Sequence, residues 1–287
     1  MKKRLIVYIV LLSFILTGCF NKKEPLVDLG DPNVEYKSFY DGKYGTTGKL
    51  EGNSVVVSIF VKDKTTEWTS SGTDKRNISN IHSKLRTSTK FLNECAAKYN
   101  KKATFIYDWE QYPDLKYEVS FKEDIITSKG TYYDLQTKWI KNTINSKALK
   151  NKYKADNILY IFYINTDFTN DVKPWTITHN NCKSCDIEYT NIFYRFRGIA
   201  TPAATFAHEM LHQFGAPDFY YANDYINQRY VDYLEKTDSK DIMFFINKGT
   251  SIGSRFTDLD AYYVGIAPRP QEANEWNLNQ NEFERWK

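Results

Sequence analysis

The chain has 287 residues, of which 41% are hydrophobic, 26% charged and 16% aromatic, and this composition excludes disordered and collagen-like chains. Its net charge is only +4, so it lacks the strong basic field that nucleic-acid binding requires, and we expect no nucleic-acid partner. The length allows one large domain or two small ones, and no apolar run reaches the roughly 18 residues of a membrane-spanning helix.

The first residues have the order of a secretory leader. The cations Lys2 to Arg4 precede a short apolar run from Leu5 to Leu16, which is too short to span a membrane. The run ends in Leu-Thr-Gly-Cys, which resembles the lipobox of bacterial lipoproteins, where cleavage before the Cys is followed by lipidation of its thiol. This resemblance implies lipidation of Cys19. The alternative is an ordinary secreted protein in which a Cys occupies this position by chance.

The leader suggests a simple domain organisation. Residues 1–18 are expected to be a lipoprotein signal peptide, residues 19–52 a polar tether, and residues 53–287 a single folded domain. The mature chain would be anchored by the acyl chains on Cys19 to a bacterial cell membrane, on its extracytoplasmic side.

Alternating strands and helices are predicted in the first half of the domain. Apolar and β-branched runs predict strands, and apolar residues at helical spacing predict helices. In chain order these are a strand over Val55–Lys62, a helix over Ile78–Tyr99, a strand over Ala103–Trp109, a helix over Tyr132–Ile144 and a strand over Asn157–Asn165. This order predicts an α/β fold with a mostly parallel twisted sheet, in which the last strand is buried on both faces.

A further helix is predicted over Ala203 to Gly215, with Thr201 as its N-cap and Pro202 at its first position. The helix contains His208 and His212. Residues four apart lie on one face of a helix, one turn apart, so both imidazoles can reach one metal ion.

The residues around the two histidines complete a candidate catalytic motif. Glu209 lies beside the histidines, where a carboxylate can take a proton from a metal-activated water. Gly215 can adopt a left-handed conformation and end the helix, so that the chain turns back and Asp218 approaches the same ion. Asp224 and Asp241 remain competitors of Asp218 for the position of third ligand.

The string HEMLHQFGAPDFYY, residues 208–221, resembles the HExxHxxGxxD zinc peptidases of the metzincin-like group. The Gly-Ala-Pro-Asp-Phe-Tyr portion is most similar to the immune inhibitor A family, and the Asp is also similar to that of snapalysin. Residues 241–243, Asp-Ile-Met, resemble the Met-turn of this group, and residues 257–266 resemble the helix that follows it. The resemblance covers residues 201–266 and implies a zincin, metzincin-like catalytic domain with an active-site helix and a Met-turn.

The same resemblance implies a role for each residue that matches the motif. His208, His212 and Asp218 would be ligands of Zn²⁺, Glu209 would be the general base, and Met243 would lie beneath the histidine rings without binding the ion. Some metzincins have a Tyr two residues after the Met of the turn, whereas this chain has Phe245. The donor that stabilises the oxyanion therefore remains open, and the candidates are Tyr221, Tyr262 and Tyr263.

The other cysteines and histidines carry weaker signals. Besides Cys19 the chain has Cys95, Cys182 and Cys185, and His179 precedes the last two in an H-x2-C-x2-C pattern. An extracytoplasmic location favours a disulfide between Cys182 and Cys185. The alternatives are a bond from Cys95 to one of them, a second metal site, or free thiols. His82 lies in a predicted helix and is interpreted as a surface or packing residue.

These features lead to one functional prediction with two alternatives. The prediction is a membrane-anchored, monomeric zinc endopeptidase that hydrolyses peptide bonds in a protein or peptide substrate. The first alternative is a metal-binding surface lipoprotein without peptidase activity, although a binding protein has no need of Glu209 as a base. The second is an amidase that acts on cell-wall or glycan-linked amides.

Overall fold

The computed structural model describes residues 46–126, 132–167, 169, 172–178, 187–220, 228–249, 251–276 and 278. The elements up to the middle of the chain are β1 (Gly52–Lys62), α2 (Gly72–Lys98), β2 (Ala103–Ile106), η1 (Pro113–Leu115), β3 (Lys116–Ser120), α3 (Tyr132–Thr143), α4 (Ser146–Tyr153) and β4 (Asn157–Ile164). The later elements are β5 (Trp175–Ile177), β6 (Tyr189–Phe193), β7 (Arg195–Phe196), β8 (Ile199–Ala200), α5 (Ala203–Gln213), α6 (Gln228–Thr237), α7 (Asp258–Tyr263) and α8 (Gln271–Glu275).

A mixed, mostly parallel sheet organises the fold. Its strands pair in the order β2-β1-β4-β6-β5, and β3 also pairs with β1. All of these pairs are parallel except that of β5 with β6, which is antiparallel. The predicted α/β fold with a mostly parallel sheet is therefore confirmed.

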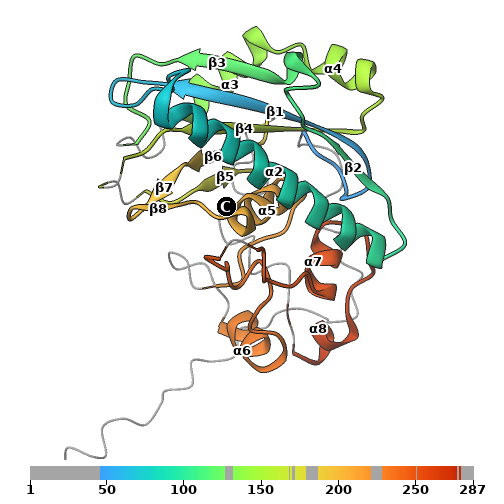
Figure 1. Cartoon of the computed structure of the whole chain (residues 1–287). Helices are drawn as coiled ribbons and strands as arrows, with labels where there is room; N and C mark the ends of the chain where they lie inside the picture. Colours follow the sequence, from blue (N-terminus) through green and yellow to red (C-terminus); the bar gives the residue numbers. More distant parts are fainter. Residues whose placement is uncertain are drawn as a thin grey trace, which may run out of the picture.

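Helices cover both faces of the sheet, with α2 and α5 on one side and α3 and α4 on the other (Figure 1). Because successive side chains of a strand point to opposite faces, each central strand contributes to two hydrophobic cores. From β4, the core under α2 and α5 receives Leu159, Ile161 and Tyr163, whereas the opposite core receives Ile158, Tyr160, Phe162 and Ile164. This double burial explains the continuous apolar run in the sequence.

The predicted elements of the first half are present with shifted ends. The strand expected from Val55 begins at Gly52, and the helix expected from Ile78 begins at Gly72. The strand expected to reach Trp109 ends at Ile106, because the chain then turns around Asp108, whose Oδ1 accepts two backbone N–H groups.

The start of the domain also differs from the expected tether boundary. Residues 46–52, which that boundary assigned to the tether, pack on the domain, where Leu50 is fully buried and its N–H donates to the Val264 carbonyl. Residues 1–18, Cys19 and the rest of the tether lie outside the described residues. Within the described part of the chain, no helix combines the length and the apolar character needed to cross a membrane.

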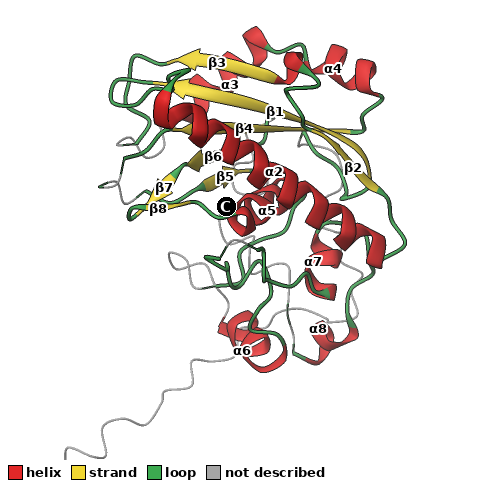
Figure 2. Cartoon of the chain, in the orientation of Figure 1, coloured by secondary structure: helices red, strands yellow, loops and turns green. Residues whose placement is uncertain are grey.

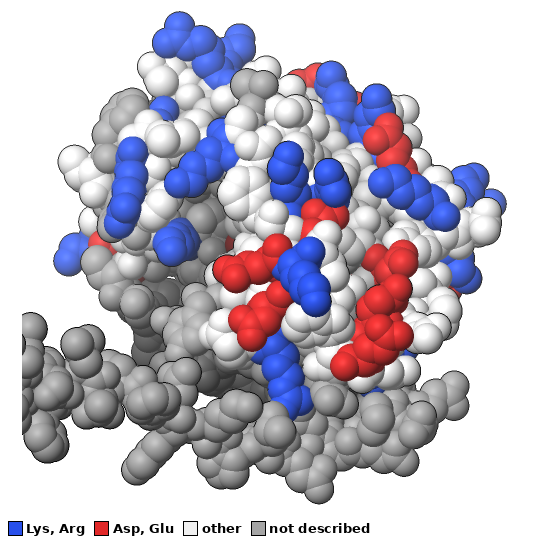
Figure 3. All heavy atoms as spheres, turned by 90° about the horizontal axis from the view of Figure 1, so that it is seen from below, with Lys and Arg blue, Asp and Glu red and all other residues white. Residues whose placement is uncertain are grey.

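The C-terminal part of the chain lies below the sheet, where α6, α7 and α8 are joined by loops (Figure 2). Seen from below, acidic side chains gather near the centre and right of the surface, while basic side chains lie mainly above and to the left of them (Figure 3). This face thus carries both signs of charge, in keeping with the near balance of charges in the sequence.

Candidate metal centre

Helix α5 is the buried helix that carries the HExxH motif. Its apolar side chains face the core shared with α2, as expected for Ala204, Ala207 and Leu211. The N-terminus of α5 differs from the prediction, because Pro202 is the N-cap and the Thr201 hydroxyl donates instead to the Phe193 carbonyl at the end of β6. Thr201 therefore ties the helix to the sheet rather than capping it.

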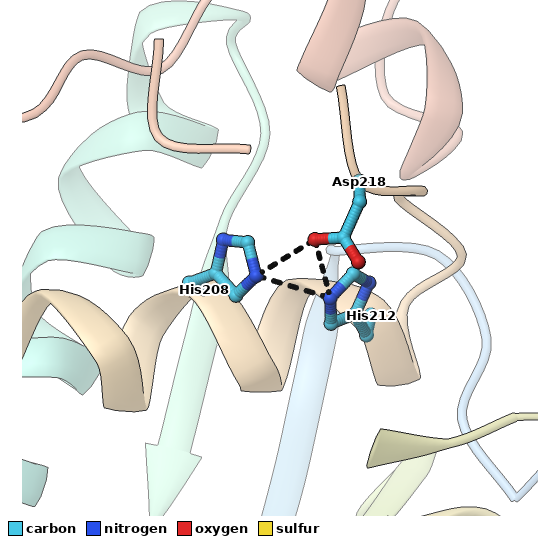
Figure 4. A group of neighbouring side chains, drawn as sticks. All are labelled: His208, His212 and Asp218. Atoms are coloured by element: carbon cyan, nitrogen blue, oxygen red, sulfur yellow. Dashed lines mark hydrogen bonds and ion pairs between the residues drawn. The ribbon is translucent and has the colours of Figure 1, made fainter. Parts of the chain in front are cut away.

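Three side chains converge at one point beside α5 (Figure 4). The Nε2 atoms of His208 and His212 are 3.1 Å apart. Asp218 comes from the loop after the helix, and its Oδ1 lies 3.0 Å from the first Nε2 and 3.3 Å from the second. Gly215 allows this approach, since its φ of 102° turns the chain back in a conformation that favours glycine. The structure thus places His208, His212 and Asp218 in one group that could hold a metal ion.

Backbone carbonyls fix the orientation of both imidazole rings. Nδ1 of His208 is 2.9 Å from the carbonyl oxygen of Ile242, and Nδ1 of His212 is 2.7 Å from that of Ala216. A carbonyl oxygen only accepts, so each Nδ1 carries the proton. In the neutral rings both Nε2 lone pairs then face the convergence point, which is the arrangement that metal-binding histidines adopt.

The charge of the Asp218 carboxylate favours a cation, either a proton or a metal ion, between it and the two histidines. Burial opposes ionisation of both His212 and Asp218. For His212, the negative charge of Asp218 outweighs the effect of burial and raises the pKa of the imidazole to about 9. Conversely, the imidazoles hold the pKa of the Asp218 carboxyl far below its usual range, although burial alone would raise it. Oδ1 of Asp218 is buried and makes no hydrogen bond within the described residues. A proton or a metal ion is therefore needed at this point.

Glu209 lies in the same buried region and is held by strand β5. Its Oε2 accepts a hydrogen bond of 2.6 Å from the Thr176 hydroxyl. Burial raises the pKa of the Glu209 carboxyl, although His208 and His212 act in the opposite direction. Thr176 was not predicted, because it comes from a three-residue strand that no periodic pattern indicated.

The predicted Met-turn lies next to the histidines, and its backbone supports them. The Ile242 carbonyl accepts a hydrogen bond from Nδ1 of His208. The Met243 carbonyl accepts one from the N–H of Phe219, the residue that follows Asp218. The Met243 side chain is fully buried in the core. The described contacts of this turn with the site run through its backbone.

Asp241 does not compete for the metal position. Its Oδ1 accepts the backbone N–H groups of Met243 and Phe244, and its Oδ2 accepts the Thr257 hydroxyl. The carboxylate thus builds the turn, and of the three acids considered the structure brings Asp218 to the histidines. Asp224, the other competitor, lies outside the described residues.

Among the described residues, the tyrosine that contacts the site is not one of the expected oxyanion donors. The Tyr263 hydroxyl bonds to Tyr230 in the core, and Tyr262 is buried there as well. Tyr221 lies outside the described residues. It is Tyr220 that stacks on His208, with ring centroids 6.1 Å apart, and hydrogen-bonds to Asp218. Its position two residues after the Asp was the available signal.

The remaining residues singled out in the sequence lie away from the three converging side chains or outside the described residues. Phe245 is 47% exposed and belongs to none of the side chains that converge at the site. Cys95 is a free, buried thiol on α2. The proposed Cys182–Cys185 disulfide and His179 lie outside the described residues. His82 is buried and packs on Trp109, as a packing residue would, but it also lies beside two carboxylates.

Asp218→Ala is expected to weaken zinc binding by more than about 100-fold, because loss of a ligand should exceed the roughly 10–100-fold effect of losing an outer partner. Competition with a chromophoric chelator measures this affinity. Binding by the parent should strengthen as the pH rises towards 9, since the ion displaces the proton of His212. The matched control is Asp224→Ala, which should bind as the parent does. If Asp224→Ala lost the ion and Asp218→Ala kept it, the third ligand would be Asp224.

Comparisons with known proteins add little to this geometry. No family model matches the chain, and no curated protein matches it. A solved structure described as a chaperone–substrate complex aligns with 79% of this chain at 11% identity and a TM-score of 0.33. This chain covers 35% of the length of that one.

Proposed function

We propose that this chain is a zinc-dependent endopeptidase. The observation that carries the proposal is the convergence of Nε2 of His208, Nε2 of His212 and Oδ1 of Asp218. Glu209 follows His208 in the chain, and both histidines act electrostatically on its buried carboxyl. The three edges of this triangle are 3.0, 3.1 and 3.3 Å. A tetrahedral zinc ion with bonds of about 2.0 Å needs ligand atoms about 3.3 Å apart, so the donors fit this ion in both type and spacing.

The proposed mechanism assigns one task to each side chain. A bound zinc ion, with three protein ligands and an open position, supplies a Lewis acid that lowers the pKa of water and polarises a carbonyl. Glu209 accepts the proton of the attacking water and then delivers it to the leaving nitrogen. Thr176 holds the Glu209 carboxylate in place during both transfers. Tyr220 is the described tyrosine best placed to donate to the developing oxyanion.

The surroundings of the enzyme are proposed from the sequence. The leader and Cys19 support attachment to the extracytoplasmic side of a bacterial membrane, so the substrates would be proteins or peptides outside the cytoplasm. The near balance of charge offers no reason to expect a highly charged substrate.

Cleavage of a proteome-derived peptide library tests the proposal. We expect the protein to cut peptides, to stop when a chelator removes its metal, and to regain activity when Zn²⁺ is added back. The cut sites would also give the specificity. If the zinc-loaded protein cuts no peptide but releases fragments from cell-wall material, the substrate is a cell-wall or glycan-linked amide. If it hydrolyses neither, the binding-protein alternative replaces the enzyme.

A further inference from the structure

A second group of potential metal ligands lies between α2 and the turn that follows β2. His82 comes from α2, whereas Asp108 and Glu110 come from the turn between β2 and η1. One ligand atom of each residue lies within 4.8 Å of the others. None of the three residues belongs to the group around His208, so the two sites can be removed independently.

His82 is held rigidly, and one of its nitrogens lacks a partner. Its side chain is 5% exposed and packs against the Trp109 ring, with centroids 4.5 Å apart. Nε2 is buried and makes no hydrogen bond within the described residues, although Oδ1 of Asp108 is only 3.1 Å away. The two atoms are thus close without the alignment of a hydrogen bond. A buried polar atom in this state requires an explanation.

A shared cation accounts for this geometry. If both atoms bind one ion at about 2.0–2.1 Å, a separation near 3.1 Å corresponds to an angle of about 100° at the ion, between the octahedral and tetrahedral values. The turn already holds Asp108 in position, since its Oδ1 accepts the N–H groups of Glu110 and Gln111. Glu110 is 72% exposed, and its Oε1 lies 3.9 Å from Nδ1 of His82, so its side chain has to turn towards the Nε2 side of the ring to bind the same ion.

We propose that His82, Asp108 and Glu110 form a second metal site, which binds a divalent transition ion such as Zn²⁺ and joins α2 to the turn after β2. The imidazole ligand favours such an ion over Ca²⁺, which prefers an all-oxygen shell. One nitrogen and two carboxylates leave positions for water, and the turn is tied to the helix whether or not the first site is filled.

Metal stoichiometry of the full chain tests the site. The parent and the double variant His208→Ala/His212→Ala are stripped with chelator, reloaded with Zn²⁺, dialysed and analysed by elemental mass spectrometry. We expect the double variant to keep one zinc that the further change His82→Gln removes. We also expect Zn²⁺, but not Ca²⁺, to raise the melting temperature of the double variant.

Two further variants distinguish loss of a ligand from loss of the fold. Glu110→Gln alters a side chain that is 72% exposed, so it should fold normally by circular dichroism while binding zinc at least about tenfold more weakly in the double-variant background. Glu94→Gln removes an exposed carboxylate of the same helix and should bind as its parent does. The proposal is overturned if His82→Gln leaves the zinc content unchanged, or if folded Glu110→Gln binds zinc with unchanged affinity.

Discussion

Glu209→Gln is expected to lower the rate of peptide hydrolysis by about 10²–10⁴-fold while leaving the zinc content unchanged. The amide of Gln has nearly the shape of the carboxylate, and its oxygen can still accept the Thr176 hydroxyl, so the helix and the neighbouring histidines should keep their positions. What is lost is the ability to take a proton. The measurement is kcat for a peptide found in the library, with the metal content determined on the same samples.

Thr176 provides the controls for this result. Thr176→Val retains the base but removes the hydroxyl that orients it, so a smaller loss of about tenfold is expected, and Thr176→Ser should restore most of the rate. A Glu209→Gln variant that binds zinc and hydrolyses peptides at the parental rate would show that another group is the base.

Asp260→Asn is expected to stabilise the protein at pH 8 by about 1–3 kcal/mol, judged from the roughly 1.4 kcal/mol that one unit of pKa shift represents. Asp260 and Asp241 are both fully buried, and the carboxyl of Asp241 acts electrostatically on that of Asp260. Burial raises the pKa of Asp241 to about 6, and burial together with the charge of Asp241 raises that of Asp260 well above its ordinary value. The shared proton stays in place only while the pH is below these folded-state values.

The sign of the pH dependence follows from these raised pKa values. The contribution of the pair is complete below the unfolded pKa of about 3.9 and is lost as the pH rises through the folded-state values. An Asn at position 260 keeps an oxygen that can accept the N–H of Thr257, but it never ionises. Urea unfolding at pH 5.5 and pH 8 should therefore show the largest gain at pH 8.

The exposed Asp258 of the same helix is the matched control for this prediction. Asp258→Asn should preserve the pH dependence of the parent, because its side chain is in water and bonds to Tyr99. Any metal that both proteins bind contributes equally, so the difference between variant and parent is free of the pH dependence of metal binding. Equal gains at pH 5.5 and pH 8 would contradict the assignment of the proton to this pair.

The sequence predicted the elements whose patterns are local and repeated. The run from Asn157 to Asn165 and the motif from His208 to His212 are each recognisable from a few consecutive residues. In the structure the run forms strand β4, and the motif lies in helix α5. The approach of Asp218 was also predictable, because Gly215 supplies the turn that redirects the chain.

The predictions that failed depended on contacts between distant segments. Thr201 has the chemistry of an N-cap, but a carbonyl eight residues earlier takes its hydroxyl. Thr176 meets Glu209 across 33 residues, and its three-residue strand is too short for any periodicity. Asp241 was a plausible ligand by composition, yet the N–H groups of its own turn and Thr257 engage both of its oxygens. Local patterns carry no information about such partners.

The support of His208 by the turn at residues 241–244 has a consequence for the time at which the site can form. The ring of His208 is oriented by a carbonyl 34 residues further along the chain, and the turn that provides this carbonyl is itself braced by Thr257. A nascent chain that has emerged only as far as α5 therefore holds its two histidines without the partners that aim them. If the leader directs export, the growing polypeptide passes through the translocation machinery with this group of side chains unassembled, and the proposed activity can begin only where synthesis and folding end.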